Sequence, residues 1–547
     1  METKSRSWWR NVLVPGILVG GWAVVLAVVW LPGGWPRDFC WVVTYASSLL
    51  LLLALAVWFW FFALVRRRTR LGVSLLVLAL LAGVCAVFQL EGFDGDLGPI
   101  IRFRSWARAS PPQGQLVVRP LKPLVWASSP QDWPGFLGPR RDGVLAGVKL
   151  LAEQETSPVE RVWAVSLGKG WSSFAVVGQL AFTQEMYGDR EYVTCLALAD
   201  GHVLWRSLHA PPEEETPQAF RSRLGGDGPR ATPTVAQGRV YAYSSRGVLS
   251  CFDLATGKRL WHRPVLLPYG NQPPRWGCAS SPLVVDQLVV VAGGSGRSPA
   301  LLAFHARDGK PAWQAGTPGS SSDSYDSPTL ATVCGKRQIL YVSDDQVAGY
   351  EPATGRQLWS HPWPWAAAVH PKVPQVLVVD QHHLVVAAGY DSGVALLHLQ
   401  QDQQGNIQAR LLWKNRNLKP KFTNPVVYQD HLFGLDMGIL TCLELKSGRR
   451  RWKRGRFGHG QLLLVGDVLL IQAESGQVAL VRADPRRFRL LARWPALADK
   501  TWNVPALAGP WLLVRNDRQG MCFRLDVQPL AKRDSGQSHA SDPPAGQ

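Results

Sequence analysis

The chain has 547 residues and a formal net charge of +19, with 46% apolar and 18% charged residues, a composition that excludes a wholly disordered protein. This length exceeds one ordinary core, so a multi-part protein or a large repeat domain is expected. The 52 Gly, 40 Pro and 25 Trp predict many turns and an aromatic-rich interior. The 8 Cys form no CxxC motif and no adjacent pair, which excludes a zinc ribbon, a thioredoxin-type site and a dense disulfide framework.

Three uncharged apolar segments begin the chain, at residues 13–31, 39–65 and 71–90. Each is long enough to cross the ~30 Å hydrocarbon layer of a bilayer as an α-helix. A cleaved signal peptide would account for the first segment but not for the two that follow it. We therefore predict a membrane anchor with three transmembrane helices.

Basic residues flank these segments unevenly. Lys4, Arg6 and Arg10 precede the first segment, and Arg66–Arg68 with Arg70 separate the second from the third. The positive-inside rule places both basic groups in the cytoplasm. The prediction is a multi-pass protein of the cytoplasmic (inner) membrane whose C-terminal part lies on the periplasmic, extracytoplasmic side.

Residues 91–130 are rich in Pro and carry no stable apolar pattern, so this segment is predicted to be a linker. The polar residues 531–547 are predicted to form a disordered tail.

A short segment recurs five times in the remaining chain. In each copy a Gly lies four residues before a Trp, and a small residue lies six residues before that Gly. The copies are Cys195–Trp205, Cys251–Trp261, Ala303–Trp313, Gly349–Trp359 and Cys442–Trp452. The pattern predicts a strand, a tight turn whose Gly adopts positive φ, and a second strand that carries the Trp.

The small residue of each copy is expected to be buried, since a free Cys packs as a small hydrophobe. Cys522 is expected at the same position of a further unit, whereas Cys278 and Cys334 lie outside the pattern.

Eight Trp residues recur 39 to 56 residues apart: Trp163, Trp205, Trp261, Trp313, Trp359, Trp413, Trp452 and Trp494. Most units also place a Pro before an apolar, β-rich run, where a strand needs no amide donor. Each unit is therefore predicted to form four short antiparallel strands, which is a propeller blade. We predict an all-β, eight-bladed propeller at residues 131–530, closed by the strand around Trp163. A different treatment of the Trp413 unit gives seven blades.

The repeated segments resemble the pyrroloquinoline-quinone-type (PQQ-like) β-propeller repeat family. Residues Trp133–Gly143 are also similar to the segment that leads into bacterial PQQ-like propellers. The resemblance covers residues 131–530 and implies the propeller fold. It leaves the activity open, because the family includes quinoprotein dehydrogenases and non-catalytic scaffolds similar to the outer-membrane assembly factor BamB.

A dehydrogenase of this family would need PQQ and calcium. The resemblance implies a vicinal disulfide against the quinone, and the chain has no adjacent Cys pair. Calcium prefers six to eight oxygen ligands. Asp323 and Asp326 are the best carboxylate pair, with Asn424 and Asn503 in equivalent loops, although such residues also form ordinary turns. We expect no catalytic residue, no metal and no cofactor, with PQQ and calcium as the alternative.

The resemblance implies that the loops preceding the first strand of each blade surround one mouth of the central channel. These loops form the candidate binding surface, where aromatic and Arg side chains either bind a partner or seal the channel. The candidate residues are Trp171, Arg230, Trp276, Asp323, Tyr325, Asp326, Lys421, His459, Trp502 and Asn503.

A second candidate surface is a basic rim on the sixth unit, around Trp452. Its members are Arg449, Arg450, Arg451, Lys453, Arg454 and Arg456. The rim either binds an anionic partner, such as lipid head groups, an envelope polymer or an acidic protein, or is a solvated basic face.

Three functions remain. We favour a membrane-anchored, non-catalytic binding or assembly scaffold in the cell envelope, with protein or polymer partners on the propeller loops and no nucleic acid. The alternatives are a membrane-bound PQQ-dependent dehydrogenase and a ligand sensor. The predicted spans contain no ionisable Asp, Glu, Lys, Arg or His, whereas intramembrane proton or redox sites usually need such groups.

Overall fold

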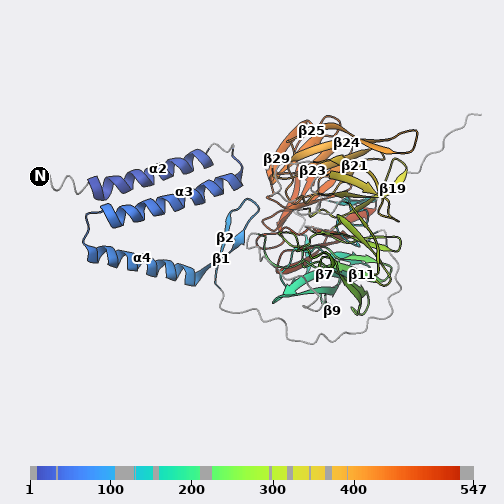
Figure 1. Ribbon diagram of the computed structural model, residues 1–547, viewed down its shortest axis with the longest axis horizontal. Coiled ribbons are helices and arrows are strands. Elements are labelled where there is room, and N and C mark those ends of the chain that lie inside the picture. Colours follow the sequence, from blue (N-terminus) through green and yellow to red (C-terminus); the bar gives the residue numbers. More distant parts are fainter. Residues whose placement is uncertain are drawn as a thin grey trace, which may run out of the picture.

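The computed structural model contains three long helices joined to a β-propeller through a small hairpin (Figure 1). It describes residues 9–31, 35–104, 129, 131–151, 159–209, 225–294, 299–316, 324–343, 346–363, 372–390 and 392–529. The predicted tail at 531–547 and most of the predicted linker lie outside the described residues.

The three long helices confirm the three apolar segments predicted from the sequence. They comprise a π-helical turn η1 (Trp9–Leu13), α2 (Val14–Trp30), α3 (Arg37–Val57) with its π-helical end η2 (Trp58–Phe62), and α4 (Arg67–Val87). All three are long and apolar enough to span a membrane, and almost none of their surface is buried within the protein. The third helix ends at Val87 rather than at Leu90 as predicted, because the chain turns there into a strand.

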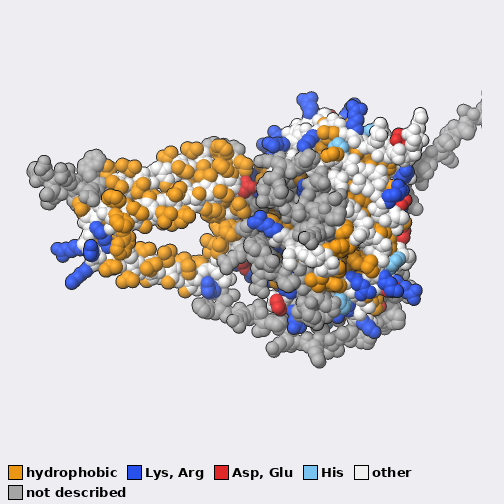
Figure 2. All heavy atoms as spheres, in the orientation of Figure 1, with side chains coloured by type: hydrophobic (Ala, Val, Ile, Leu, Met, Phe, Trp, Pro, Cys, Tyr) orange, Lys and Arg blue, Asp and Glu red, His pale blue; other side chains and the backbone are white. Residues whose placement is uncertain are grey.

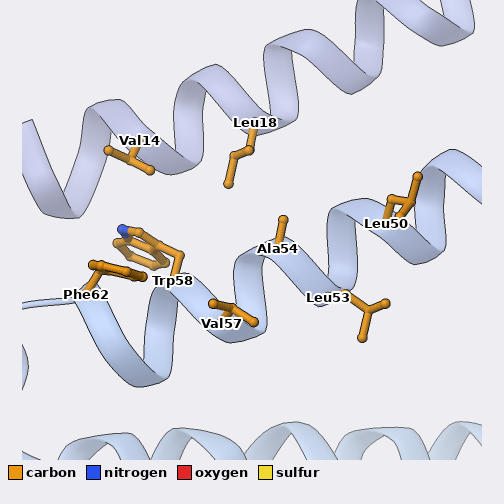
Figure 3. Close-up of a pocket in the computed structure, with 8 residues that line it drawn as sticks. All are labelled: Val14, Leu18, Leu50, Leu53, Ala54, Val57, Trp58 and Phe62. Carbon is orange, nitrogen blue, oxygen red and sulfur yellow. The ribbon is translucent and has the colours of Figure 1, made fainter.

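A groove of about 640 Å³ lies between α2 and α3 (Figure 3). Its lining consists of Val14, Leu18, Leu50, Leu53, Ala54, Val57, Trp58 and Phe62. These side chains carry no charge, so the groove suits hydrocarbon chains and offers no site for an ionic ligand.

The predicted linker is wrong at its start, because residues 88–103 form an antiparallel hairpin. Strand β1 (Phe88–Phe93) pairs with β2 (Pro99–Phe103). The Asp94 carboxylate closes the turn by accepting hydrogen bonds from the amides of Asp96 (3.0 Å) and Gly98 (2.6 Å). This side-chain turn favours a hairpin where sequence periodicity alone indicated none.

Eight four-stranded antiparallel blades form the propeller, which confirms the eight-bladed prediction. Blade 1 consists of β6 (Ala175–Val177), β7 (Leu180–Tyr187), β8 (Arg190–Ala197) and β9 (Val203–Leu208). Blade 2 consists of β10 (Thr234–Ala236), β11 (Arg239–Tyr243), β12 (Val248–Asp253) and β13 (Arg259–Pro264). Blades 3 and 4 are β14 (Leu283–Val285), β15 (Leu288–Ala292), β16 (Leu301–His305), β17 (Pro311–Ala315), and β18 (Thr329–Val333), β19 (Lys336–Val342), β20 (Gln346–Tyr350), β21 (Gln357–Pro362). A 3₁₀ turn, η4 (Leu267–Tyr269), lies between blades 2 and 3.

Blades 5 and 6 are β22 (Leu377–Val378), β23 (His383–Ala388), β24 (Gly393–Gln401), β25 (Ile407–Asn415), and β26 (Val426–Tyr428), β27 (His431–Asp436), β28 (Ile439–Glu444), β29 (Arg450–Arg456). Blade 7 is β30 (Gln461–Val465), β31 (Val468–Gln472), β32 (Gln477–Arg482) and β33 (Leu490–Pro495), extended by the short strand β3 (Val144–Leu145). Blade 8 is β34 (Ala506–Ala508), β35 (Trp511–Arg515), β36 (Gln519–Arg524) and the earlier strand β5 (Glu160–Ser166). A separate pair joins β4 (Val148–Leu150) to β37 (Val527–Pro529).

The ring closes as the sequence predicted. Strand β5 pairs antiparallel with β36 and places Trp163 opposite Cys522. The outer strand of the last blade therefore comes from the start of the propeller, which leaves no gap between the first and last blades.

The repeated Gly and Trp form the contact between neighbouring blades. Each repeat Gly has φ between 67° and 73°, and a Cβ atom there would lie only 2.4 to 2.8 Å from the Trp ring of the preceding blade. Gly309 is such a position, against Trp261. Six of the indoles also donate a hydrogen bond of 2.8 to 3.1 Å to a carbonyl of the next blade. The Gly thus provides both the turn and the space for the neighbouring indole.

The small residue of each repeat faces the Trp of its own blade across the strand pair. Cys195, Cys251, Cys442 and Cys522 occupy this position in four blades. All four are buried free thiols, which confirms the prediction that they pack as small hydrophobes, and Cys278 and Cys334 are also buried and free.

Replacement of Trp261 by Ala is expected to destabilise the propeller by ~3–5 kcal/mol, because it opens a cavity between blades 2 and 3. Trp261→Phe retains most of the packing and loses the hydrogen bond to the Ala306 carbonyl, so its cost should be only ~1 kcal/mol. Thermal melting of the two variants measures the difference. Equal melting temperatures for Trp261→Ala and the unsubstituted protein would contradict the inter-blade role.

Candidate functional site at the channel mouth

Polar residues form a ring where the innermost strands of the blades begin. We call this end of the propeller the channel mouth. These residues connect neighbouring blades: the amide of Thr232 donates to Ser281 Oγ and the amide of Ser281 to Ser327 Oγ, both at 2.9 Å. Farther round, the amide of Gln375 donates to Asn424 Oδ1 at 2.7 Å, and Asn503 Nδ2 donates to the Ser172 carbonyl at 2.8 Å. Asn424 and Asn503 therefore hold blades together, which accounts for their place in the loops.

The segment preceding the propeller packs against the innermost strands of several blades. Trp133 is fully buried and exchanges two backbone hydrogen bonds with Val176 of β6, while Val144 pairs with Leu464 of blade 7. From this segment the guanidinium of Arg141 donates to the carbonyls of Ser281 (3.0 Å) and Pro282 (2.9 Å). The segment thus contacts blades 1, 3 and 7, and it also contacts blade 2, since the Val235 amide donates to the Pro134 carbonyl.

The hairpin turn between β1 and β2 inserts into the channel mouth. Asp96 is buried there, with its Oδ1 atom 2.8 Å from His459 Nε2. The amide of Gly95 donates to Glu474 Oε1 (2.7 Å), and Lys421 Nζ donates to the Gly95 carbonyl (2.9 Å). Burial opposes ionisation of Asp96, but the interaction with His459 and the positive charges of Lys421 and Arg456 together outweigh it and lower the pKa of Asp96.

The mouth also contacts the helices directly. Lys421 Nζ lies 3.0 Å from Oδ2 of Asp38, in the first turn of α3, and its side chain is almost completely buried. Tyr45 of α3 donates a hydrogen bond of 2.7 Å to the Leu97 carbonyl in the hairpin turn. The face of the propeller that carries the mouth is therefore the face turned toward the helices (Figure 1).

An aromatic layer lies beside the inserted turn. Ring centroids are 5.1 Å apart for Trp171 and Trp502 and 5.0 Å apart for Trp502 and Phe422. Lys500 Nζ lies 5.0 Å above the Trp171 ring and 4.2 Å above the Trp502 ring, and donates to the Phe93 carbonyl at 3.0 Å. Burial lowers the pKa of Lys500 to about 8, despite the nearby carboxylates of Asp517 and Glu474.

The structure brings together four of the predicted mouth residues: Trp171, Lys421, His459 and Trp502. A second group holds Trp276 and Tyr325, whose rings meet edge to face at 6.3 Å and whose amide–hydroxyl hydrogen bond is 3.1 Å. Arg230 stabilises its own loop, because its guanidinium donates hydrogen bonds to the carbonyls of Gly225, Gly226 and Gly228. Asp323 lies outside the described residues.

Sequence reasoning missed several residues of the mouth. They are Asp38, Asp94, Asp96, Phe422, Glu474 and Lys500. Glu474 connects three of the groups: its Oε1 accepts from Gly95 and from Trp502 Nε1 (2.7 Å), and its Oε2 accepts from the His459 amide (2.9 Å). The Asp-Gly-Asp sequence at 94–96 was the one available signal for a turn.

The described carboxylate of the predicted calcium pair is unsuited to binding calcium. Asp326, the remaining described carboxylate of the predicted pair, is fully buried and accepts a hydrogen bond from the Val342 amide at 2.8 Å. Burial raises the pKa of Asp326 well above its ordinary value, which favours the uncharged acid, a poor calcium ligand. Across the described ranges, no three His, Cys, Asp or Glu side chains cluster in a way that could hold a metal.

The predicted basic rim lies on β29, the outer strand of blade 6. Arg449, Arg450, Arg451 and Arg454 are exposed. Arg456 is exposed as well, although one of its guanidinium nitrogens lies 3.9 Å from Asp96 Oδ2, whereas Lys453 is half-buried, with its Nζ 2.6 Å from Asp436 Oδ2. The rim thus extends from the outer edge of the propeller to the channel mouth.

Residues 189–454 match the family model described as outer membrane protein assembly factor BamB. With its eight blades and Gly–Trp repeats, the C-terminal part of the chain is an eight-bladed β-propeller that is similar to this family, whose model matches just under half of the chain. The BamB of Shewanella oneidensis is 23% identical to it over 334 residues, which cover 57% of this chain and 78% of that protein. The BamB of Xanthomonas campestris pv. campestris is 34% identical over 95 residues, or 17% of this chain and 23% of that protein.

Among solved structures, a europium-containing methanol dehydrogenase superposes with a TM-score of 0.54 at 12% identity, over 73% of this chain and 98% of that chain. At this identity the similarity shows a shared fold and carries no information on activity.

Replacement of His459 by Ala is expected to loosen the hairpin, because Asp96 would lose its partner while remaining buried. A buried hydrogen bond to a charged group contributes ~1.5–3 kcal/mol, so amide exchange in residues 88–103 should become at least ~10-fold faster. Hydrogen–deuterium exchange of the full chain measures this, with Arg449→Ala on the exposed rim as the control. Unchanged exchange in the hairpin would contradict the role of this pair.

Lys500 predicts a dependence of stability on pH. Its pKa of about 8 in the folded protein lies below the ordinary 10.5, so the unfolded chain binds this proton more tightly. The contribution of this group to stability is therefore lowest below pH ~8 and rises toward pH ~10.5. Between pH 7 and 9.5 the unfolding free energy, relative to Lys500→Met, should rise by ~1–2 kcal/mol. Parallel pH series of thermal melts would show no such divergence if Lys500 titrates normally.

Proposed function

We propose that this protein is a membrane-anchored, non-catalytic scaffold of the cell envelope. The face of its propeller that carries the channel mouth contacts the membrane anchor, and its remaining surfaces bind protein partners. The observation that carries the proposal is the insertion of the β1–β2 turn into the channel mouth. A soluble substrate would have to enter through that face, and the contacts of Asp96, Gly95 and Phe93 occupy the part of it formed by the loops that precede blades 6, 7 and 8.

The similarity to BamB proteins supports a role in assembly. Those relatives are named as outer membrane protein assembly factors. We extend to this chain the same class of role, the binding of other proteins in the envelope. The outer strands of the blades and the turns on the far side of the propeller are the surfaces left for such partners.

The charge distribution supports the proposed orientation. Arg67, Arg68 and Arg70 lie in the first turn of α4, whereas α3 begins beside the propeller, where Asp38 meets Lys421. In Figure 2 the basic side chains of the helical part gather at its end away from the propeller. By the positive-inside rule, that end lies in the cytoplasm and the propeller in the periplasm.

The test of the proposal has two arms. In the first, single Cys residues are introduced in a Cys85→Ala background at Thr69, next to the Arg cluster, and at Lys446, on the propeller; both positions are exposed. A membrane-impermeant maleimide added to cells with a permeabilised outer membrane should label the Cys at 446. The Cys at 69 should react only after the inner membrane is disrupted, and the reverse pattern would overturn the orientation.

The second arm addresses the dehydrogenase alternative. The full chain in detergent is melted with and without added PQQ and calcium. A ligand at about 100 times its Kd adds ~2.7 kcal/mol to stability, a clear shift in melting temperature. We expect no calcium-dependent shift, and such a shift would overturn the non-catalytic proposal.

A further inference from the structure

The β1–β2 hairpin has one polar and one apolar face. Leu90 pairs with Ile101 and Phe88 with Phe103, and residues two apart on a strand share a face, so these four side chains lie together. The Phe88 and Phe103 rings are 4.7 Å apart. Leu90, Ile101 and Phe103 are 55%, 61% and 73% exposed, respectively, an unusual exposure for adjacent large apolar side chains.

The polar face of the hairpin docks on the propeller. Arg102 forms ion pairs with Glu91 of the neighbouring strand (2.6 Å) and with Asp499, in the loop that precedes blade 8. Glu91 in turn pairs with Arg518, between β35 and β36. The apolar face is therefore the one turned away from the propeller, and no described residue covers it.

Both ends of the hairpin are tied to the helices. Its base continues directly from α4, which ends at Val87. Its turn contacts Tyr45, which lies eight residues into α3, or ~12 Å along the helix axis. Trp30 and Trp41 lie at the same end of the helices, with ring centroids 5.3 Å apart, where indoles mark the boundary between hydrocarbon and water. The hairpin thus lies at the level of this boundary.

We propose that the apolar face of the β1–β2 hairpin is an interfacial membrane-binding surface, inserted among the lipids that surround α3 and α4. Its occupant is the glycerol and upper acyl region of the bilayer, continuous with the lipid-facing surface of α4. The hairpin then bridges two environments: lipid on one face, and the channel mouth and its loops on the other. This inference rests on the membrane anchoring in the proposed function.

Spin labels on single Cys residues test the insertion. The background is Cys85→Ala, since Cys85 is the one exposed free thiol within the described residues. Labels are placed at Ile101 and Phe103, at Leu78 in the middle of α4 as a lipid control, and at Leu260 on outer strand β13 as a water control. Leu78 and Leu260 are 61% and 43% exposed. The full chain is reconstituted in bilayers, and collision rates with oxygen and with a water-soluble nickel chelate are measured.

Labels at 101 and 103 should collide with oxygen more than with the nickel chelate, as at 78 but at shallower depth, and the label at 260 should show the opposite. If the labels at 101 and 103 show the same collision rates as the label at 260, while the label at 78 collides mainly with oxygen, the hairpin proposal is overturned and the membrane anchoring is supported. If 78 also behaves as water-exposed, the anchoring itself is wrong and the hairpin proposal fails with it. The two labelled positions are both exposed, so loss of folding at one leaves the other to decide.

Discussion

The contact between a Trp of one blade and the repeat Gly of the next fixes how most neighbouring blades of the ring pack. A side chain at the Gly position would occupy the space of the indole, and the indole N–H reaches a carbonyl of the adjoining blade. Five of the eight junctions between blades carry this contact: Trp163 with Gly201, Trp205 with Gly257, Trp261 with Gly309, Trp313 with Gly355, and Trp413 with Gly448. Much of the ring therefore repeats one kind of interface. Because β5 supplies the last outer strand, the first and last blades share this contact, with Trp163 against Gly201.

The repeats account for the ring, and the residues between them account for what surrounds it. The segment around Trp133 and Arg141 packs against the innermost strands, and the hairpin turn with Asp96 docks on the loops that precede blades 6, 7 and 8. Ionisable groups at the mouth stabilise this docking. Lys421 pairs with Asp38 and donates a hydrogen bond to the Gly95 carbonyl. Glu474 accepts hydrogen bonds from Gly95, His459 and Trp502.

Most of the fold could be predicted from the sequence because its signals are local or periodic. Three uncharged segments give the helices, and the Gly–Trp spacing gives the blades, their number and their closure. The placement of the candidate residues in loops around one mouth came from the family resemblance. Of these residues, Trp171, Lys421, His459 and Trp502 lie together beside the hairpin turn. These predictions need no knowledge of contacts between distant, non-repeating segments.

The hairpin and the role of Lys500 could not be predicted for the opposite reason. Residues 88–90 continue the apolar run of the third helix, so composition places them in the membrane, and the break at Val87 depends on pairing with residues 99–103. Glu474, Phe422 and Lys500 occupy ordinary loop positions, and their importance comes from the turn at Asp96, several hundred residues earlier in the chain. Such long-range contacts leave no periodic trace in a single sequence.

The closure of the ring by β5 has a consequence for biosynthesis. Strand β5 is synthesised near the start of the propeller, whereas its partner β36 ends at residue 524. Strand β5 therefore stays unpaired until most of the propeller has been synthesised. Until then the first blade has an open neighbour and β5 exposes unpaired backbone edges, the kind of surface on which β-proteins aggregate. A polypeptide released before its C-terminal blade would lack closure altogether. The ring can therefore close only after both β5 and β36 have been synthesised and are present in the same compartment.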